Sequence, residues 1–200
     1  MRILSMGVAS VIVEHPPVSP AAWAIGLRSL DLPGVTDVVP AAATVLVSCV
    51  DADALAAAVA RFGDVVPEIA GGADHVVTIP VVYDGEDLDA VAVACGLTVE
   101  EVVELHTGAE YRVAFCGFAP GFGYLSGLPE ALHLPRRPTP RTRVPAGAVA
   151  IAAEYAAVYP RPSPGGWHLL GATDHVLFDV ERRPPAVLQP GTSVRFRRAT

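Results

Sequence analysis

Three stretches in the second half of the chain combine residue types that could do chemistry. The first, residues 117–125 (GFAPGFGYL), interleaves glycine and proline with Phe118, Phe122 and Tyr124. Glycine permits close backbone approach and positive φ angles, and aromatic rings supply flat walls for a ligand. The pattern is compatible with a binding loop and also with a tight turn whose aromatic side chains only pack.

The second stretch, residues 135–147 (PRRPTPRTRVPAG), carries Arg136, Arg137, Arg141 and Arg143. Proline holds such a segment semi-extended, so arginines two to four residues apart can converge on one anion. Guanidinium groups bind carboxylates and phosphates through paired hydrogen bonds. The alternative is a solvated run of charge that pairs with the eight acidic residues between positions 84 and 110, a segment without arginine.

The third stretch, residues 159–171 (YPRPSPGGWHLLG), contains a Ser-Pro-Gly-Gly sequence at 163–166. This sequence predicts a turn whose exposed backbone amides could hold an oxyanion. Trp167 and His168 follow in a predicted strand, where neighbouring side chains point to opposite faces. We expect Trp167 to pack and His168 to lie at the periphery.

No standard catalytic set accompanies these stretches. The sequence has neither a G-x-S-x-G nucleophile motif nor an H-E-x-x-H zinc motif, and we predict no metal site. His106 shares one helical face with Val99, Val102 and Val103, so it points with the apolar side of its helix. Burial there would lower the pKa of the imidazole and keep it neutral near pH 7, suited to accept a proton.

The basic residues exclude several chemistries, because all 14 are arginine. Without lysine the chain has no phosphate-loop lysine, no Schiff base to pyridoxal phosphate and no biotinylated lysine. A net charge of −7 argues against general nucleic-acid binding, which needs a basic face. The ten arginines of residues 135–200 still allow an anionic ligand or an acidic partner surface.

Composition indicates a folded protein away from the membrane. Hydrophobic residues make up 52% of the chain and charged residues 18%, enough to build a core. No apolar run approaches the ~20 residues that cross a bilayer, and the N-terminus has no signal-peptide core. We therefore expect no membrane association and a cytoplasmic location.

The elements that must position the three stretches suggest an α+β protein of two domains. Residues 1–82 are predicted in the order β-α-β-β-α-β, a small ferredoxin-like α/β sandwich that ends with the strand HVVTIPVVY. Residues 83–200 begin with an acidic segment of two short helices. Short strands separated by glycine and proline follow, a pattern typical of a closed or sandwiched β-structure.

Four segments, at residues 79–106, 117–129, 135–147 and 159–171, together resemble one family. This family contains the B subunit of 5-oxoprolinase, allophanate hydrolase subunit 1 and a sporulation-kinase inhibitor. The resemblance implies a cyclophilin-like β-barrel as the second domain. It also implies a companion from the family of allophanate hydrolase subunit 2 and the 5-oxoprolinase C subunit, and a third component, the 5-oxoprolinase A subunit.

The resemblance also implies site residues and a co-substrate. We expect His106, Arg141 and Tyr124 to be catalytic. The residues expected to bind substrate or nucleotide are Phe118, Pro120, Gly121, Phe122, Arg136, Pro145, Gly147, Pro164, Gly165, Gly166 and Trp167. ATP, with Mg²⁺, is expected to be bound by the complex, with no cofactor evident in this chain alone.

The function expected from the resemblance is that of one component of an ATP-dependent hydrolase that cleaves a small amide, with 5-oxoproline as the leading substrate. Arg136, Arg141 and the glycine turns would line one groove of the barrel with His106 and Tyr124. The alternatives are a carboxyltransferase subunit of the allophanate hydrolase or urea carboxylase type and a binding protein that inhibits a sensor kinase. A prolyl isomerase is a further alternative, suggested by the barrel alone.

Overall fold

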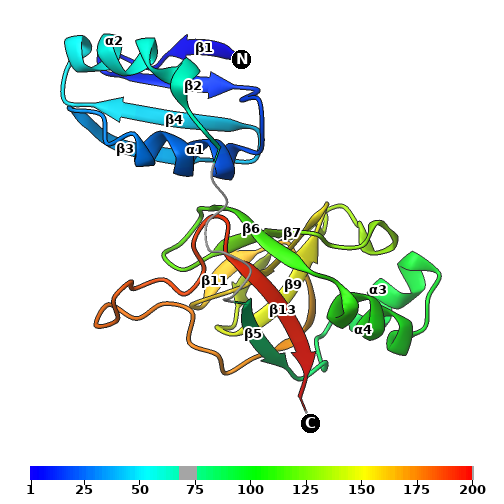
Figure 1. The fold of residues 1–200 in the computed structure, drawn as a ribbon. Coiled ribbons are helices and arrows are strands. Elements are labelled where there is room, and N and C mark those ends of the chain that lie inside the picture. The colour runs from blue at the N-terminus through cyan, green and yellow to red at the C-terminus, as the bar shows by residue number, and fades with distance from the viewer. Residues whose placement is uncertain (68–75, 200) are drawn as a thin grey trace. The chain divides into compact units, whose positions relative to one another are not determined.

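The computed structural model describes residues 1–67 and 76–199, and the chain divides into two compact units, Met1–Gly72 and Ala73–Thr200 (Figure 1). The mixed α+β class is confirmed, with a barrel-like sheet in the second unit. Among the described residues, none of the helices combines the length and the apolar character needed to cross a membrane.

The first unit packs two helices on one face of a four-stranded antiparallel sheet of order β1-β2-β4-β3. Its elements are β1 (Arg2–Ser5), β2 (Ser10–Glu14), α1 (Pro20–Ser29), β3 (Val35–Pro40), β4 (Thr44–Cys49), α2 (Ala52–Ala60) and the 3₁₀ helix η1 (Phe62–Asp64). The side chain of Ser19 caps α1 by accepting from the amide of Ala22, and Asp51 caps α2 by accepting from Ala54. The alternating residues of β2 and β4 form a core with Trp23 of α1.

The predicted strand order of the first domain is wrong at both ends. The N-terminal stretch forms two strands, β1 and β2, because the chain reverses between them around Gly7, where φ is +76°. The strand expected to complete this sheet, β5 (Val76–Val81), lies in the second unit and pairs in parallel with β13 (Ser193–Arg198). A partner more than a hundred residues away leaves no signal in the local pattern.

The second unit is built on a seven-stranded sheet of order β12-β9-β10-β7-β6-β13-β5. A bridge between Val82 and Ala172 joins the two edges of this sheet, so the barrel is nearly closed. The other elements of the unit are α3 (Leu88–Cys95), α4 (Val99–Gly108), β6 (Tyr111–Cys116), β7 (Gly123–Ser126), η2 (Glu130–Leu132), β8 (Arg141–Val144), β9 (Ala148–Ala152), β10 (Tyr155–Val158), β11 (Ser163–Gly165) and β12 (His168–Ala172).

The two faces of the barrel sheet carry different cores. Along β9, Val149 and Ile151 belong to a large core shared with β5, β6, β13 and the helices α3 and α4. The alternating alanines of β9 face the other way, into a second core with Phe122, Tyr159 and Trp167. Small alanine side chains leave room for these large rings. The two-stranded sheet of β8 and β11 contributes to the same face and brings the second and third stretches of the sequence together.

Candidate functional site

The three stretches singled out in the sequence meet at a small cleft of about 80 Å³. The loop between β6 and β7 supplies two rings, β7 supplies a third, and the segment before β8 supplies an arginine. Tyr159, directly after β10, and the segment from β11 to β12 supply the remaining walls. The lining residues are Phe118, Phe122, Tyr124, Arg136, Tyr159, Pro164, Gly165, Gly166 and Trp167.

The aromatic walls of the cleft are fixed by edge-to-face packing. The ring of Phe122 lies 5.1 Å from Tyr124, 5.3 Å from Tyr159 and 5.7 Å from Trp167, between ring centroids. Such pairs add about 0.5–1.5 kcal/mol each beyond burial, so the walls are rigid. Phe118 differs, because 57% of it is exposed and its φ is +66°. A non-glycine residue in this conformation is strained, which is common at ligand sites.

Gly165 lets a hydroxyl group reach the wall of the cleft. A Cβ atom at Gly165 would lie 2.2 Å from the hydroxyl oxygen of Tyr159, so any larger residue would displace this side chain. Burial raises the pKa of the Tyr159 hydroxyl, and the charge of Arg136 acts in the opposite direction. The net shift is upward, so the hydroxyl stays protonated at neutral pH and can donate a hydrogen bond.

Arg136 is the cation of the cleft. Its side chain is exposed and, among residues 1–67 and 76–199, it has no carboxylate within ion-pair distance. A guanidinium group beside flat aromatic walls suits a small planar molecule that carries a carboxylate or phosphate. The structure brings Arg136, Gly165 and Gly166 to one cleft, and their role in binding stays a prediction.

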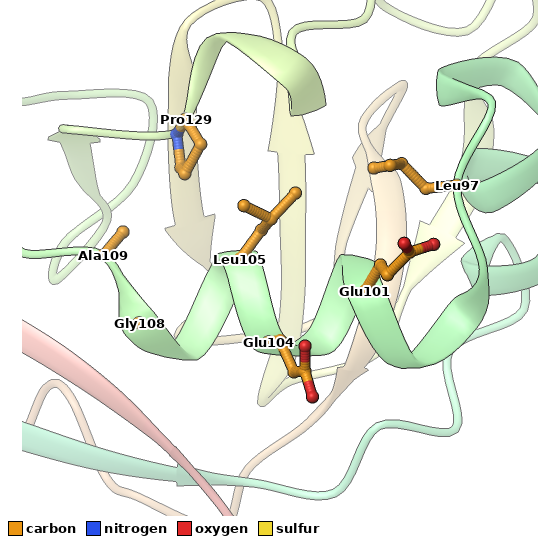
Figure 2. Close-up of a pocket in the computed structure, with 7 residues that line it drawn as sticks. All are labelled: Leu97, Glu101, Glu104, Leu105, Gly108, Ala109 and Pro129. Atoms are coloured by element: carbon orange, nitrogen blue, oxygen red, sulfur yellow. The ribbon is translucent and has the colours of Figure 1, made fainter.

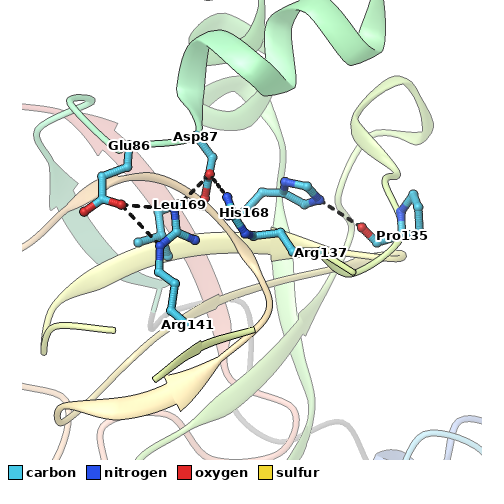
Figure 3. Close-up of polar contacts among 7 residues, drawn as sticks. All are labelled: Glu86, Asp87, Pro135, Arg137, Arg141, His168 and Leu169. Carbon is cyan, nitrogen blue, oxygen red and sulfur yellow. Dashed lines mark hydrogen bonds and ion pairs between the residues drawn. The ribbon is translucent and has the colours of Figure 1, made fainter. Parts of the chain in front are cut away.

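Arg141 and Arg137 instead pair with acidic residues (Figure 3). The Nη2 atom of Arg141 lies 2.9 Å from Oδ1 of Asp87 and 3.1 Å from Oε2 of Glu86, and Arg137 donates to the same Asp87 oxygen. Hydrogen bonding to Asp87 raises the pKa of Arg141. The expectation that Arg141 lines the groove with Arg136 is therefore wrong, and pairing with the 84–110 segment holds for these two arginines.

Asp87 is a buried carboxylate that the sequence did not single out. Its exposed fraction is 3%, and its Oδ2 atom accepts a hydrogen bond of 2.8 Å from the amide of Leu169. Burial alone would raise the pKa of this carboxyl, but the hydrogen bonds from Arg141 and Leu169 and the charges of Arg141 and Arg137 hold it below its usual value. Asp87 stands at the N-cap of α3 without capping the helix, because its oxygens face these donors.

His106 lies in the large core, away from the cleft. The side chain has no solvent exposure, and Nδ1 is hydrogen-bonded to the hydroxyl of Tyr83 at 2.7 Å. Its ring lies 4.4 Å from that of Phe196, and its Nε2 atom has no partner among the described residues. Burial lowers the pKa of His106 to about 3. The apolar orientation and neutral state were predicted correctly, but the expectation that His106 lines the groove is wrong.

Four further predicted residues shape loops and do not line the cleft. A Cβ atom at Gly121 would lie 2.6 Å from Cβ of Phe178, and one at Gly147 would lie 2.2 Å from the carbonyl oxygen of Thr173. Both glycines have positive φ, of +82° and +79° respectively, so the shape of each loop depends on glycine itself. Pro120 and Pro145 are exposed beside them. The binding role of all four remains a prediction.

Sequence reasoning also missed Tyr159 as a lining residue, although it is the first residue of the third stretch. A run of tyrosine and three prolines indicated only a loop, and the last residues of β10 had no recognisable strand alternation. Asp87 was one of eight acidic residues in its segment. Its position immediately before an apolar helix is the signal that could have distinguished it.

A larger groove of about 570 Å³ runs along α4 (Figure 2). It is lined by Leu97, Glu101, Glu104, Leu105, Gly108, Ala109 and Pro129. The lining has two carboxylates, no cation and no aromatic ring, so it is unsuited to an anionic ligand. Glu101 is occupied in a capping box with Thr98. None of the predicted site residues lies in this groove.

Comparison with known proteins finds relatives of similar sequence. The 5-oxoprolinase B subunit of Escherichia coli O157:H7 is 42% identical over 206 residues, which cover 98% of this chain and 94% of that protein. The protein of the same name in Haemophilus influenzae (strain ATCC 51907 / DSM 11121 / KW20 / Rd) is 48% identical over 123 residues, 60% of this chain and 58% of that protein.

Solved structures share the fold. The crystal structure of TTHA0988 matches with a TM-score of 0.84 and 38% identity over 96% of this chain, which spans only 41% of that longer chain. A conserved uncharacterized protein from Pyrococcus horikoshii matches with a TM-score of 0.60 and 31% identity, covering 99% of this chain and 97% of that chain. The structure of Kluyveromyces lactis urea carboxylase matches with a TM-score of 0.70 and 17% identity. The match covers 96% of this chain and 21% of the urea carboxylase chain, and it shows a shared fold alone.

The family model for the carboxyltransferase domain, subdomains C and D, matches residues 1–188. This match covers both units, including every lining residue of the cleft. The chain therefore belongs to the family of the carboxyltransferase domain, subdomains C and D.

Proposed function

We propose that this chain is the B subunit of a 5-oxoprolinase and binds 5-oxoproline in the aromatic cleft. The complex would convert 5-oxoproline, ATP and water to glutamate, ADP and phosphate. The observation that carries the proposal is the position of Arg136, a guanidinium without a carboxylate partner among the described residues, at a cleft walled by aromatic rings. Relatives named as the B subunit of 5-oxoprolinase support the choice of substrate.

The chemistry of the cleft suits this substrate. 5-oxoproline is a five-membered lactam that carries one carboxylate. The flat ring can lie against Phe118 and Trp167, and the carboxylate can pair with the guanidinium of Arg136. The protonated hydroxyl of Tyr159 is available as a donor to the lactam oxygen, where negative charge develops when the amide is activated. Of the three residues predicted to be catalytic, Tyr124 lines the cleft, and His106 and Arg141 do not.

The cleft does not suit ATP. Its volume is about 80 Å³, whereas sites for larger ligands typically enclose about 300 Å³ or more. Among residues 1–67 and 76–199, no group of three or more His, Cys, Asp or Glu side chains is arranged to hold Mg²⁺. We assign no step of the nucleotide chemistry to this chain. The proposal therefore requires the companion C subunit, with the A subunit as the third component, and expects no turnover by this chain alone.

The test is an assay of ATP hydrolysis that depends on 5-oxoproline, with this chain co-expressed with its companion subunits. Arg136→Ala should raise the KM for 5-oxoproline at least tenfold, which corresponds to about 1.4 kcal/mol of lost binding. The KM for ATP should be unchanged. Arg143→Ala is the matched control, because Arg143 lies in the same segment, is exposed and does not line the cleft.

Two results would contradict the proposal. One is ATP hydrolysis that is indifferent to 5-oxoproline, and the other is an unchanged KM for 5-oxoproline in Arg136→Ala. A complex that accepts allophanate or carboxylates urea instead would favour the carboxyltransferase alternative. Binding to a sensor kinase without turnover of any amide would favour the inhibitor alternative.

A further inference from the structure

The residues on both sides of Arg136 are anchored to the wall of the cleft. The Nε2–H group of His168 donates to the carbonyl oxygen of Pro135 at 2.9 Å (Figure 3). The backbone amide of Arg137 donates to the carbonyl oxygen of Gly166 at 2.8 Å. Arg136 therefore sits on a short strap, residues 135–137, that is tied at each end to the segment from β11 to β12.

Asp87 gives this strap a further anchor. Its carboxylate accepts from the side chain of Arg137 and, at 2.8 Å, from the amide of Leu169 in β12. Arg141 of β8 donates to the same carboxylate at 2.9 Å. One buried group thus holds the strap, β8 and β12 together. Removing the carboxylate would leave the partly buried guanidinium of Arg137 without its acidic partner and Arg141 with Glu86 alone, which is unfavourable.

The same carboxylate also separates the roles of three arginines. Asp87 and Glu86 together carry two negative charges and face the two positive charges of Arg137 and Arg141. These two guanidinium groups are neutralised and held, so they do not compete for an anion. Arg136, on the same strap, keeps its full charge directed to the cleft.

We propose that Asp87 is a positioning residue for anion recognition, acting through Arg137 to fix the strap from which Arg136 reaches the cleft. The inference rests on the proposed function, because the anion is taken to be the carboxylate of 5-oxoproline. Asp87 does not line the cleft, so it would act on a ligand there only through other residues. Its effect on binding therefore depends on Arg136 being present.

This dependence separates positioning from a general structural role. The dissociation constant of 5-oxoproline is measured by NMR titration of the full chain, for Asp87→Asn in the wild-type background and in the Arg136→Ala background. Asp87→Asn should weaken binding at least fivefold when Arg136 is present and less than twofold when it is absent. A variant that only loosened the fold would weaken binding by the same factor in both backgrounds.

A second variant protects the test against unfolding of Asp87→Asn. Arg137→Gln keeps Asp87 paired with Arg141 and Leu169 but removes the ion pair between the strap and Asp87. Its effect on binding should likewise depend on Arg136. Arg143→Gln, in the neighbouring strand, should change binding less than twofold in both backgrounds. Folding of each variant is monitored by thermal unfolding.

The outcomes distinguish this inference from the proposed function. The positioning role is overturned if Asp87→Asn or Arg137→Gln weakens binding of 5-oxoproline by the same factor in the wild-type and Arg136→Ala backgrounds. That result would leave the proposed function intact. A wild-type chain that does not bind 5-oxoproline, or whose binding is unaffected by Arg136→Ala, overturns the proposed function of the cleft and with it this inference.

Discussion

Two aromatic clusters in the second unit look alike in composition and differ in use. One surrounds His106, with Tyr83, Tyr111 and Phe196 around the imidazole. The other surrounds the cleft, where Phe122 and its neighbours meet Arg136. Each places an ionisable side chain among rings in tilted or edge-to-face contact. The sequence suggested that both belong to one groove.

The two clusters differ in the solvent exposure of the ionisable side chain. His106 is fully buried and hydrogen-bonded to Tyr83, so burial lowers its pKa to about 3 and makes it a neutral packing residue. Arg136 is exposed and has no carboxylate partner among the described residues. An ionisable group among aromatic rings is therefore a candidate for ligand binding only where its charge remains accessible and unneutralised.

We call the buried rings around His106 the closed cluster and the rings around the cleft the open cluster. The largest effect on stability should come from removing the imidazole of the closed cluster. His106→Ala leaves a cavity in the core and removes the partner of the Tyr83 hydroxyl, and should lower the free energy of unfolding by on the order of 3 kcal/mol. Arg136→Ala should change it by less than about 0.5 kcal/mol, as is usual at the surface. Urea unfolding followed by circular dichroism measures both. A similar decrease in the free energy of unfolding in the two variants would contradict the distinction between the clusters.

The pH dependence of stability should also distinguish the closed cluster. In the unfolded chain His106 takes up a proton near pH 6.5, whereas in the folded chain it stays neutral to about pH 3. Acidification below pH 6.5 therefore favours unfolding, with a slope that approaches about 1.4 kcal/mol per pH unit. Between pH 6.5 and 5 the wild type should lose roughly 1.5 kcal/mol more than His106→Gln.

Asp87 does not interfere in this pH range. The pKa of its carboxyl is lowered on folding, so the stability it provides is complete above the unfolded value of about 3.9 and is lost only as the pH falls through the folded value. Parallel stability curves for the wild type and His106→Gln between pH 6.5 and 5 would show that the histidine is not held neutral. The measurement is urea unfolding at a series of pH values.

Local patterns were sufficient where local forces decide the structure. The i, i+3, i+4, i+7 spacing of Val99, Val102, Val103 and His106 predicted α4 and its buried face. The aromatic residues of 117–125, the glycines at 165–166 and Arg136 do meet in one cleft. Helix periodicity accounts for α4. The shared cleft, in contrast, was expected from the resemblance to the family and not from a local pattern.

Tertiary pairing could not be predicted in the same way. The strand β5 has the same alternation whether it joins the first sheet or pairs with β13, and only the distant partner decides. The arginines of 135–143 are alike in type and similarly spaced. The sequence therefore did not show that Asp87 forms ion pairs with Arg137 and Arg141 and not with Arg136. That choice depends on a carboxylate fifty residues away, brought close by the barrel.

A smaller effect on stability than that of His106→Ala is expected at Phe118, in the open cluster around the cleft. Its φ of +66° is strained for any residue with a Cβ atom, so Phe118→Gly should be more stable than Phe118→Ala, by up to about 1 kcal/mol. Both variants remove the exposed ring from the cleft and should weaken binding of 5-oxoproline. Because the ring would contact the lactam and not the carboxylate, this loss should be the same factor with and without Arg136, in contrast to Asp87→Asn. NMR titration in both backgrounds measures it, and a loss that vanished in Arg136→Ala would mean that Phe118 also acts through the arginine.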